Sequence, residues 1–464
     1  MREPAAIGLP PDFRFGASTA AYQIEGAVTE GGRGRSVWDD FCDEGGRITD
    51  GSSGAVACDS YHRYSEDVDL LARLGVDTYR FSFAWPRIQP DGTGRANESG
   101  VDFYDRLIDR LCAAGIAPAA TIFHWDTPTA LQARGGWENR ETTERFAAYT
   151  EILADRFADR VEMWMPVNEP GVVTLLGHGS GLHAPGRQLG LGALQVAHHL
   201  LLAHGRAVEV LRSVGASAVG CANNHSLIWP ASDAAEDREA ADLYDVVANR
   251  TFAEPMLLGS YPDGVAERLA GPVAEDLTVI GAPLDFYGVN SYFPLRVGAL
   301  TGAAAGPSAG PGREPLPPPL PFAMLPIEGY ERTDLGWPVV PDAFRDVLVG
   351  LHTDYGDRLP PIYVTENGCS YAVGPDESGR VKDTARVAFL DQHLRALAQA
   401  RDLGADVRGY FAWSLLDNFE WAEGYTQRFG LVWVDFESLQ RTAKDSFQWY
   451  ADVIRTAREQ GEDG

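Results

Sequence analysis

Eight short apolar runs, rich in β-branched and aromatic residues, recur along the 464-residue chain. Between them lie longer stretches whose apolar positions repeat with helical spacing, such as 65–75, 101–115 and 383–404. The second of these follows Ser99 and ends at Gly115, which are typical start and stop signals of a helix. The pattern is typical of βα units. The runs are 13–19, 78–85, 118–125, 161–168, 218–224, 285–293, 361–367 and 407–416.

Eight strand-like runs, each followed by helical periodicity, predict a single closed (β/α)₈ TIM barrel over residues 1–464, with long βα loops at its C-terminal face. An open doubly wound sheet usually has a glycine-rich phosphate turn after its first strand. The nearest sequence here, EGGRGRSVWDD at 30–40, follows no strand and lacks that spacing, so no nucleotide site is expected. Residues 299–335 are predicted to form a long Pro/Gly-rich surface loop near the barrel mouth.

The composition limits the partners and the compartment. A net charge of −27 argues against nucleic acid and anionic membranes. No run approaches the ~20 apolar residues of a membrane span, and the N-terminus lacks a secretory pattern. Five scattered cysteines, none in a C-x-x-C pair, favour a reducing cytoplasm over a disulfide framework or a cysteine zinc site. His198, His199 and His204 have no carboxylate at ligand spacing, so no metal or organic cofactor is expected.

Polar and aromatic residues gather at the C-terminal ends of the eight runs, and in a barrel these ends share one mouth. Two glutamates, Glu169 and Glu366, end different runs, as the two carboxyl groups of a glycosidase would. A single strand-end glutamate is more often a solvated loop residue, so the prediction depends on the pair and its surroundings. Tryptophans offer flat faces to a sugar ring. The neighbours are Gln23, Arg80, Trp85, His124, Trp125, Asn168, Asn290, Tyr292, Trp337, Trp413, Glu420 and Trp421.

Five motifs in this order resemble glycoside hydrolase family 1, the retaining β-glucosidases and their relatives. They are FRFGASTAAYQIEGA (13–27), HWDTP (124–128), NEP (168–170), VTENG (364–368) and WSLLDNFEWAEGYTQRFGL (413–431). The resemblance extends from Phe13 to Tyr450 and implies that Glu169 is the general acid/base and Glu366 the nucleophile.

The resemblance also implies roles for the neighbouring side chains. Arg80 and Tyr292 would flank Glu366, and Tyr292 would also border the substrate. Trp413 would form a stacking floor, and Trp337 a platform for the leaving group. The glycone hydroxyls would be bound by Gln23, His124, Asn168, Glu420 and Trp421.

The resemblance implies a retaining exo-β-glycosidase that hydrolyses non-phosphorylated β-D-glucosides, with some tolerance for galactosides and fucosides, through a glycosyl-enzyme intermediate. Relatives that act on 6-phosphorylated sugars usually carry a serine and a lysine in the last loop, whereas residues 418–436 keep Glu420 and contain no lysine. Two alternatives stay open: a transglycosidase or specialised natural-product deglycosylase, and, from another class, a sugar-binding protein without turnover. The aglycone and the oligomeric state are open as well.

One departure from the family lies next to the chemistry. The family usually has threonine two residues before the Asn-Glu pair, and this chain has Pro166. Proline removes a ladder hydrogen bond, so a local irregularity is expected in the fourth strand. Thr127 replaces a leucine that is often seen. Pro170 is expected to hold Glu169 in an extended conformation.

Overall fold

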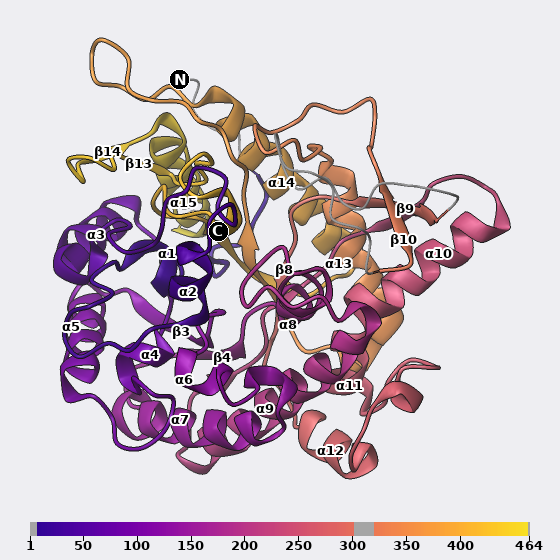
Figure 1. Ribbon diagram of the computed structural model, residues 1–464. Coiled ribbons are helices and arrows are strands. Elements are labelled where there is room, and N and C mark those ends of the chain that lie inside the picture. Colours follow the sequence, from indigo (N-terminus) through magenta and orange to yellow (C-terminus); the bar gives the residue numbers. More distant parts are fainter. Residues whose placement is uncertain (1–6, 301–319, 463–464) are drawn as a thin grey trace.

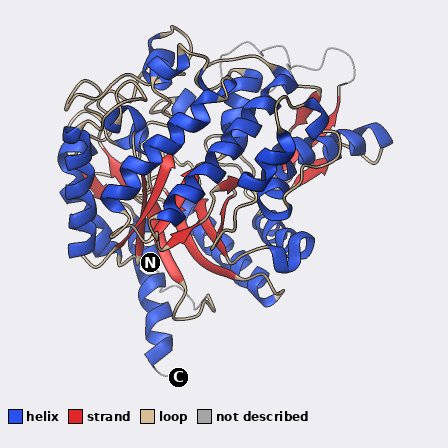
Figure 2. Ribbon diagram, turned by 90° about the horizontal axis from the view of Figure 1, so that it is seen from below, coloured by secondary structure: helices blue, strands red, loops and turns tan. Residues whose placement is uncertain are grey.

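The structure, a computed structural model, describes residues 7–300 and 320–462 (Figure 1). Figure 2 shows its strands gathered at the centre, with helices around them. The central sheet is parallel and has the order β5-β4-β3-β2-β1-β12-β11-β8-β6. Its strands are β1 (Arg14–Ser18), β2 (Thr78–Ser82), β3 (Ala117–Phe123), β4 (Met163–Val167), β5 (Ala218–Val219), β6 (Asn223–Asn224), β8 (Tyr287–Asn290), β11 (Ile362–Asn367) and β12 (Val407–Trp413).

The fifth predicted run closes the sheet into a barrel. Its first part, β5, pairs with β4 through Ala218 and Met163. Its second part, β6, pairs with β8 through Asn223 and Val289. The two edges of the sheet therefore belong to one short segment, and the (β/α)₈ prediction is confirmed, with a strand in each predicted run.

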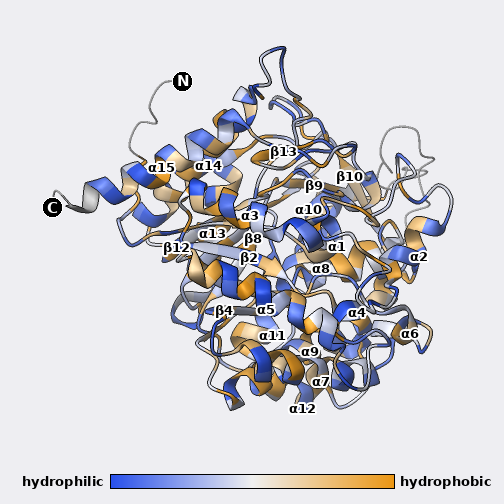
Figure 3. Cartoon of the chain, turned by 90° about the vertical axis from the view of Figure 1, so that its left-hand side faces the viewer, coloured by the Kyte–Doolittle hydropathy of each residue, from blue (hydrophilic) through white to orange (hydrophobic). Residues whose placement is uncertain are grey.

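Most of the principal helices pack their apolar stripes against the barrel, as expected for amphipathic helices, whereas α10 (Ala235–Asp245) packs against a separate small sheet. Figure 3 shows hydrophobic and hydrophilic residues side by side along them. One predicted boundary was slightly wrong: α5 begins at Glu98, with Asn97 before it, because the N–H of Gly100 bonds to the Asn97 carbonyl. These helices are α3 (Ser60–Leu74), α5 (Glu98–Ala113), α7 (Glu141–Phe157), α9 (Leu194–Ser213), α10 (Ala235–Asp245), α11 (Thr251–Leu258), α13 (Pro341–Tyr355), α14 (Thr384–Asp402) and α15 (Asp445–Glu462).

A small second sheet lies beside the barrel, next to α10 (Figure 1). It consists of β7 (Ile228–Pro230), β9 (Leu295–Ala299) and β10 (Phe322–Leu325). Strand β10 lies inside the segment 299–335 that the sequence assigned to a loop, and residues 301–319 of that segment lie outside the described residues. The sheet packs on a second apolar cluster, which includes Tyr244 and Phe322.

Pro166 does interrupt the strand ladder, as predicted. The N–H of Glu162 bonds to the carbonyl of Pro118 on β3, so a regular ladder would direct residue 166 to the Ile122 carbonyl. Proline has no N–H to give, and the hydroxyl of Tyr149 donates to that carbonyl instead, at 3.3 Å. The next bond, from Asn168 N–H to the Phe123 carbonyl, is shifted by one residue along β3.

Two further findings concern the helices and the cysteines. None of the helices within residues 7–300 and 320–462 combines the length and apolar character that crossing a membrane requires. All five cysteines are free thiols in this structure.

Candidate active site

A pocket of about 480 Å³ opens at the C-terminal ends of the barrel strands. Both predicted carboxyl groups line it: Glu169 follows β4, and Glu366 lies on β11. Tyr292, Trp337, Trp413, Glu420, Trp421 and His124 also line it, as the sequence predicted. Gln23, Arg80 and Asn168 are buried behind this surface and reach it through hydrogen bonds. Residues more than 300 positions apart are thus brought into one site by the closure of the barrel.

Glu366 is held by two strong donors. Arg80, fully buried on β2, donates from Nη1 to Oε1 of Glu366 at 2.5 Å, and the Tyr292 hydroxyl donates to Oε2 at 2.6 Å. A guanidinium and a hydroxyl directed at the same carboxylate stabilise its charged form. Burial, followed by the negative charge of Glu366, raises the pKa of Tyr292 well above its ordinary value, so the hydroxyl stays a donor.

Glu169 has a different environment. Its Oε1 accepts one hydrogen bond, at 2.8 Å, from the side-chain amide of Asn290 at the end of β8. Burial raises the pKa of Glu169, and the neighbouring charge of Glu366 raises it further. Both effects favour the protonated form of the carboxyl group, which can donate a proton.

Asn290 lines the pocket and bonds to Glu169, although sequence reasoning gave it no role. Besides Glu169, its amide donates to Oδ1 of Asn168 at 3.0 Å, and its own Oδ1 accepts from Thr365 at 2.6 Å. It thus links the carboxyl group on β4 to the residue before Glu366. Its place at the end of the sixth run was the one signal that could have identified it.

Asn168 is engaged on both sides of its amide. Its Oδ1 accepts from Arg80 at 2.6 Å, and its Nδ2 faces Nε2 of His124 at 3.1 Å. An amide N–H must donate here, so Nε2 of His124 accepts and the ring proton lies on Nδ1. Burial, followed by the charge of Arg80, lowers the pKa of His124 well below its ordinary value, so the ring is neutral. Its Nδ1 has no partner within the described residues and can donate to a ligand.

Glu420 is a third carboxyl group in the pocket, and Gln23 supports it. The Gln23 amide donates to Phe419 O at 2.8 Å, to Asn418 Oδ1 at 3.1 Å and more weakly to Glu420 Oε2 at 3.4 Å. The Oε1 of Gln23 has no partner in the described structure. Burial, and then the charge of Glu366, raises the pKa of Glu420 to about 8. Buried polar atoms without partners are rare in proteins, so this end of the pocket is suited to hydroxyl groups.

Three aromatic rings lie nearly parallel in the base of the pocket. The His124 ring stacks on Trp413, with centroids 5.9 Å apart, and on Trp421, with centroids 5.8 Å apart. Trp125 packs against Trp421 at 4.5 Å, and its indole N–H donates to the carbonyl of Asn168. Two tryptophan faces therefore stand beside the polar groups, which suits a ring with one apolar face and a polar rim.

The backbone is strained at three residues of this pocket. Trp125, Glu169 and Trp421 have φ values of 79°, 44° and 46°, which non-glycine residues rarely adopt. Such residues tend to cluster at functional sites. The expected extended conformation of Glu169 is thus wrong. Pro170 disfavours the right-handed helical region, but the N–H of Glu169 also bonds to Ala222, and the left-handed conformation allows this bond just before a helix starts.

One predicted pocket residue lies elsewhere. Trp85 is completely buried, and its ring stacks on Tyr149 at 4.9 Å with the two planes 6° apart. It begins the short helix α4 (Trp85–Ile88), which turns the ring into the apolar core. The prediction that Trp85 faces the pocket, made from its place at the end of a run, was therefore wrong.

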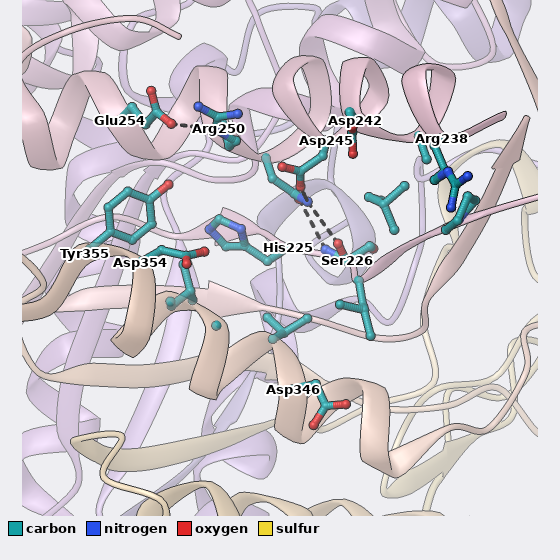
Figure 4. Close-up of a pocket in the computed structure, with 18 of the residues that line it drawn as sticks. His225, Ser226, Arg238, Asp242, Asp245, Arg250, Glu254, Asp346, Asp354 and Tyr355 are labelled. Atoms are coloured by element: carbon teal, nitrogen blue, oxygen red, sulfur yellow. Dashed lines mark hydrogen bonds and ion pairs between the residues drawn. The ribbon is translucent and has the colours of Figure 1, made fainter. Parts of the chain in front are cut away.

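A larger cavity, of about 770 Å³, lies outside the barrel between α10, α11 and α13 (Figure 4). Several of its charged residues, among them Asp242, Arg250 and Asp346, are exposed, and Arg250 pairs with the buried Glu254. It contains neither Glu169 nor Glu366, so the smaller pocket is the candidate active site.

Two histidines of α9, His198 and His199, are engaged in hydrogen bonds with other residues. His198 bonds to Tyr261 and Asp276, and His199 bonds to the Trp137 carbonyl and Gln195. Within residues 7–300 and 320–462, no cluster of three or more His, Cys, Asp or Glu could hold a metal ion.

Comparisons with known proteins agree with this geometry. The sequence model of glycosyl hydrolase family 1 matches residues 6–459. Beta-glucosidase A of Acetivibrio thermocellus is 43% identical over 97% of this chain and 98% of its own length. A bifunctional beta-D-glucosidase/beta-D-fucosidase of Bifidobacterium breve is 42% identical over 96% of this chain and 98% of its own. The family 1 β-glucosidase of Thermotoga maritima, solved in complex with isofagomine lactam, superposes with a TM-score of 0.89, at 40% identity, over 97% of this chain and 99% of that one.

Proposed function

This chain belongs to glycosyl hydrolase family 1, and we propose that it is a β-glucosidase that hydrolyses unphosphorylated β-D-glucosides with retention of anomeric configuration. Fucosides are a further substrate, in view of the bifunctional relative. The observation that carries the proposal is the pair of carboxyl groups in one pocket with opposite environments: Glu366 beside a guanidinium, and Glu169 beside an amide.

In the first step, a carboxylate oxygen of Glu366 attacks the anomeric carbon. The bond from this carbon to the glycosidic oxygen breaks, and Glu169 transfers its proton to that oxygen, so that the alcohol leaves. The sugar is then an ester of Glu366, with inverted configuration.

Before the second step, Glu366 is part of an ester and carries no negative charge. This charge no longer raises the pKa of Glu169, and Glu169, now ionised, accepts a proton from water. The resulting hydroxide oxygen attacks the anomeric carbon from the opposite face and releases Glu366. A second inversion restores the β configuration.

The glycone is held by the polar base of the pocket. Gln23 offers an acceptor, His124 a donor and Glu420 a carboxyl group, and two of these atoms have no other partner in the described structure. Trp413 and Trp421 are placed to stack on the sugar ring. Asn168 has its amide committed to Arg80 and His124, and a role at the 2-hydroxyl would use its remaining N–H.

Two measurements test this proposal. Proton NMR during hydrolysis of methyl β-D-glucoside should show β-glucose first, before mutarotation; α-glucose as first product would contradict it. A 2-deoxy-2-fluoro-β-glucoside with an activated leaving group should add one fluoroglucosyl unit to the protein, located on the peptide that contains Glu366.

Assays with the same glucosides also distinguish the two alternative functions, transglycosylation and sugar binding without turnover. A transglycosidase would yield mainly glycosides when methanol is added, and a binding protein would show affinity for glucose without turnover. The protonated Glu169 beside the ion-paired Glu366 favours turnover.

We also propose one catalytic domain, supported by a family match over 6–459, and a cytoplasmic location, supported by five free cysteines.

A further inference from the structure

The cavity of about 770 Å³ between α10, α11 and α13 has an excess of acidic side chains (Figure 4). Five carboxyl groups and two guanidinium groups line it. Both arginines are already engaged, because Arg250 pairs with Glu254 and Arg238 lies 3.8 Å from an aspartate outside the lining. Asp346 pairs with the arginine that precedes it. The lining carboxyl groups that form no ion pair in the described part of the chain are those of Asp242, Asp245 and Asp354.

These three carboxyl groups are close enough to affect one another. Asp245 is half-buried on α10, and burial raises the pKa of its carboxyl group. The charges of Asp354, on α13, and of Asp242 raise this pKa as well, whereas a neighbouring amide and a guanidinium lower it. Two helices thus direct like charges into one space, and a bound cation would relieve their repulsion.

The cation that fits this cavity is organic. Within residues 7–300 and 320–462, no group of three acidic, histidine or cysteine side chains could hold a metal ion. The unpaired carboxyl groups therefore suit a ligand whose positive charges are spread along a carbon chain, such as a protonated diamine or polyamine. Its methylene groups would pack on the apolar part of the lining, which includes Leu227, Val347 and Leu351.

A buried histidine after β6 adds a hydrogen-bond donor. His225 is 5% exposed, and Figure 4 shows its ring facing the cavity. Its Nε2 lies 2.9 Å from the Tyr287 hydroxyl, which already accepts from the Asn223 amide at 3.0 Å. The phenol proton has no other acceptor among the described residues, so Nε2 accepts it and the ring proton lies on Nδ1. Burial lowers the pKa of His225 to about 4, so the ring is neutral. Its Nδ1 has no partner within the described residues and is left to donate to a ligand.

We propose that this cavity is a second ligand site, which binds an organic amine with two or more ammonium groups and a hydroxyl group between them. The ammonium groups pair with Asp245 and Asp354, and the hydroxyl oxygen accepts from Nδ1 of His225. Neither Glu169 nor Glu366 lines the cavity, so the site takes no part in the glycosidase reaction and the inference is independent of the proposed function.

The test measures binding of three small molecules to the full chain by titration calorimetry at low salt. The probe, 1,3-diamino-2-propanol, has two ammonium groups and one hydroxyl; 1,3-diaminopropane lacks the hydroxyl, and glycerol lacks the charges. The probe should bind saturably, with one molecule per chain, and about 2- to 10-fold more tightly than diaminopropane, which is the worth of one hydrogen bond. Glycerol should not bind, because it leaves the carboxyl groups unpaired. Absence of saturable binding of the probe would overturn the site, and equal affinity of the two diamines would overturn the contact with His225.

Variants locate the binding. Asp354→Asn should raise the Kd of the probe about three- to tenfold, because it removes one ion pair, and this exposed residue can be replaced without disturbing the core. His225→Phe should bring the two diamines to equal affinity, because it removes the donor to the hydroxyl. Asp402→Asn is the matched control: this aspartate at the end of α14 is exposed, lies outside both cavities and should leave the Kd unchanged. An equal rise in the control would show attraction by the net charge of the chain only.

The active-site pocket needs a control of its own, because it also contains carboxyl groups and shares His225, Ser226 and Asn249 with the cavity as lining. Glu420 lines the active-site pocket alone, so Glu420→Gln should leave the Kd of the probe unchanged. If Glu420→Gln abolishes binding and Asp354→Asn does not, the amine lies in the active-site pocket and the inference is wrong.

Discussion

Glu169 and Glu366 are the same kind of residue in the same pocket, at the ends of two different barrel strands, yet their surroundings differ in charge. Glu366 receives hydrogen bonds from Arg80 and Tyr292, whereas Glu169 receives one from the neutral amide of Asn290. The Glu366 carboxylate is paired with the Arg80 cation, and its negative charge raises the pKa of Glu169. Two different chemical roles thus arise from one residue type through placement alone.

The Arg80 guanidinium joins the two sides. It donates to Glu366 with Nη1 and to Asn168, the residue before Glu169, with Nη2. A buried cation fixed by both strand ends sets the positions of both carboxyl groups together. Changes on the β11 side should therefore affect the reaction more strongly than changes on the β4 side.

The largest effect is expected for Glu366→Ala. Without the nucleophile, kcat should fall by about five orders of magnitude or more, as in other enzymes that lose a covalent nucleophile. Added azide should fill the space and attack the anomeric carbon, giving α-glucosyl azide. If the variant hydrolysed an aryl β-glucoside as fast as the parent enzyme does, the proposed mechanism would be refuted.

Glu169→Ala should have a smaller effect that depends on the leaving group. Loss of a general acid costs about 10²- to 10⁴-fold on substrates that need protonation, such as methyl β-glucoside. A dinitrophenyl glucoside leaves without a proton, so its first step should be nearly retained and the glycosyl-enzyme should accumulate. Azide should then give the β-glucosyl azide, the opposite anomer to that from Glu366→Ala. Equal losses on both substrates would contradict the assignment of the acid.

Tyr292→Phe removes one of the two donors to Glu366. Hydrogen bonds to charged groups are worth about 1.5–3 kcal/mol, so kcat/KM should fall about 10- to 100-fold. Tyr330→Phe, at a tyrosine that is 45% exposed, is the matched control. A loss of less than twofold for Tyr292→Phe would mean that Arg80 alone is sufficient.

The pH dependence tests the electrostatic part of the comparison. Glu169 must be protonated in the free enzyme, so its pKa sets the alkaline limb of kcat/KM. Above its own pKa of about 8 the Glu420 carboxyl group is charged, and this negative charge raises the pKa of Glu169. Glu420→Gln removes that charge, so the pKa should fall and the limb should move to lower pH, by up to about one unit. A limb that stays in place or moves to higher pH would show that Glu420 is uncharged in this range.

Much of this site follows from the sequence, and the exceptions have physical reasons. The period of the apolar runs located each strand, and a barrel brings all strand ends together, so Glu169, Glu366, Arg80 and Tyr292 could be placed at its mouth. That Arg80 and Tyr292 flank Glu366 was implied by the family resemblance. The contact between Asn290 and Glu169 links residues 121 positions apart, and local patterns carry no information on such pairs. Trp85 was misplaced because a helix that starts at the strand end turned its ring inward.

The local preference imposed by Pro170 also gave the wrong backbone conformation for Glu169. Pro170 restricts the preceding backbone, but the N–H of Glu169 also bonds to the carbonyl of Ala222 in the neighbouring β5–β6 segment, a contact that the local sequence does not reveal. The consequence of Pro166 was predictable in kind, as an interrupted ladder. Its partner was not predictable, because Tyr149 lies on α7, on the outer side of the strand.

The smallest effect is expected at this interruption, on the β4 side. Tyr149→Phe leaves the Ile122 carbonyl without the hydroxyl that replaces the missing N–H of residue 166, and it should lower the free energy of unfolding by about 1 kcal/mol. The hydroxyl does not touch the pocket, so kcat should change less than twofold.

Pro166→Thr returns an N–H at the position where a regular ladder would bond to Ile122. The cost of Tyr149→Phe should therefore be smaller in the Pro166→Thr background than in the parent chain, and urea unfolding of the four proteins measures this difference. Additive costs would mean that the hydroxyl does not substitute for the N–H. Non-additive costs with an unchanged kcat would show two things. The Tyr149 hydroxyl replaces the missing hydrogen bond of β4, and Glu169 is still positioned for the reaction with Glu366.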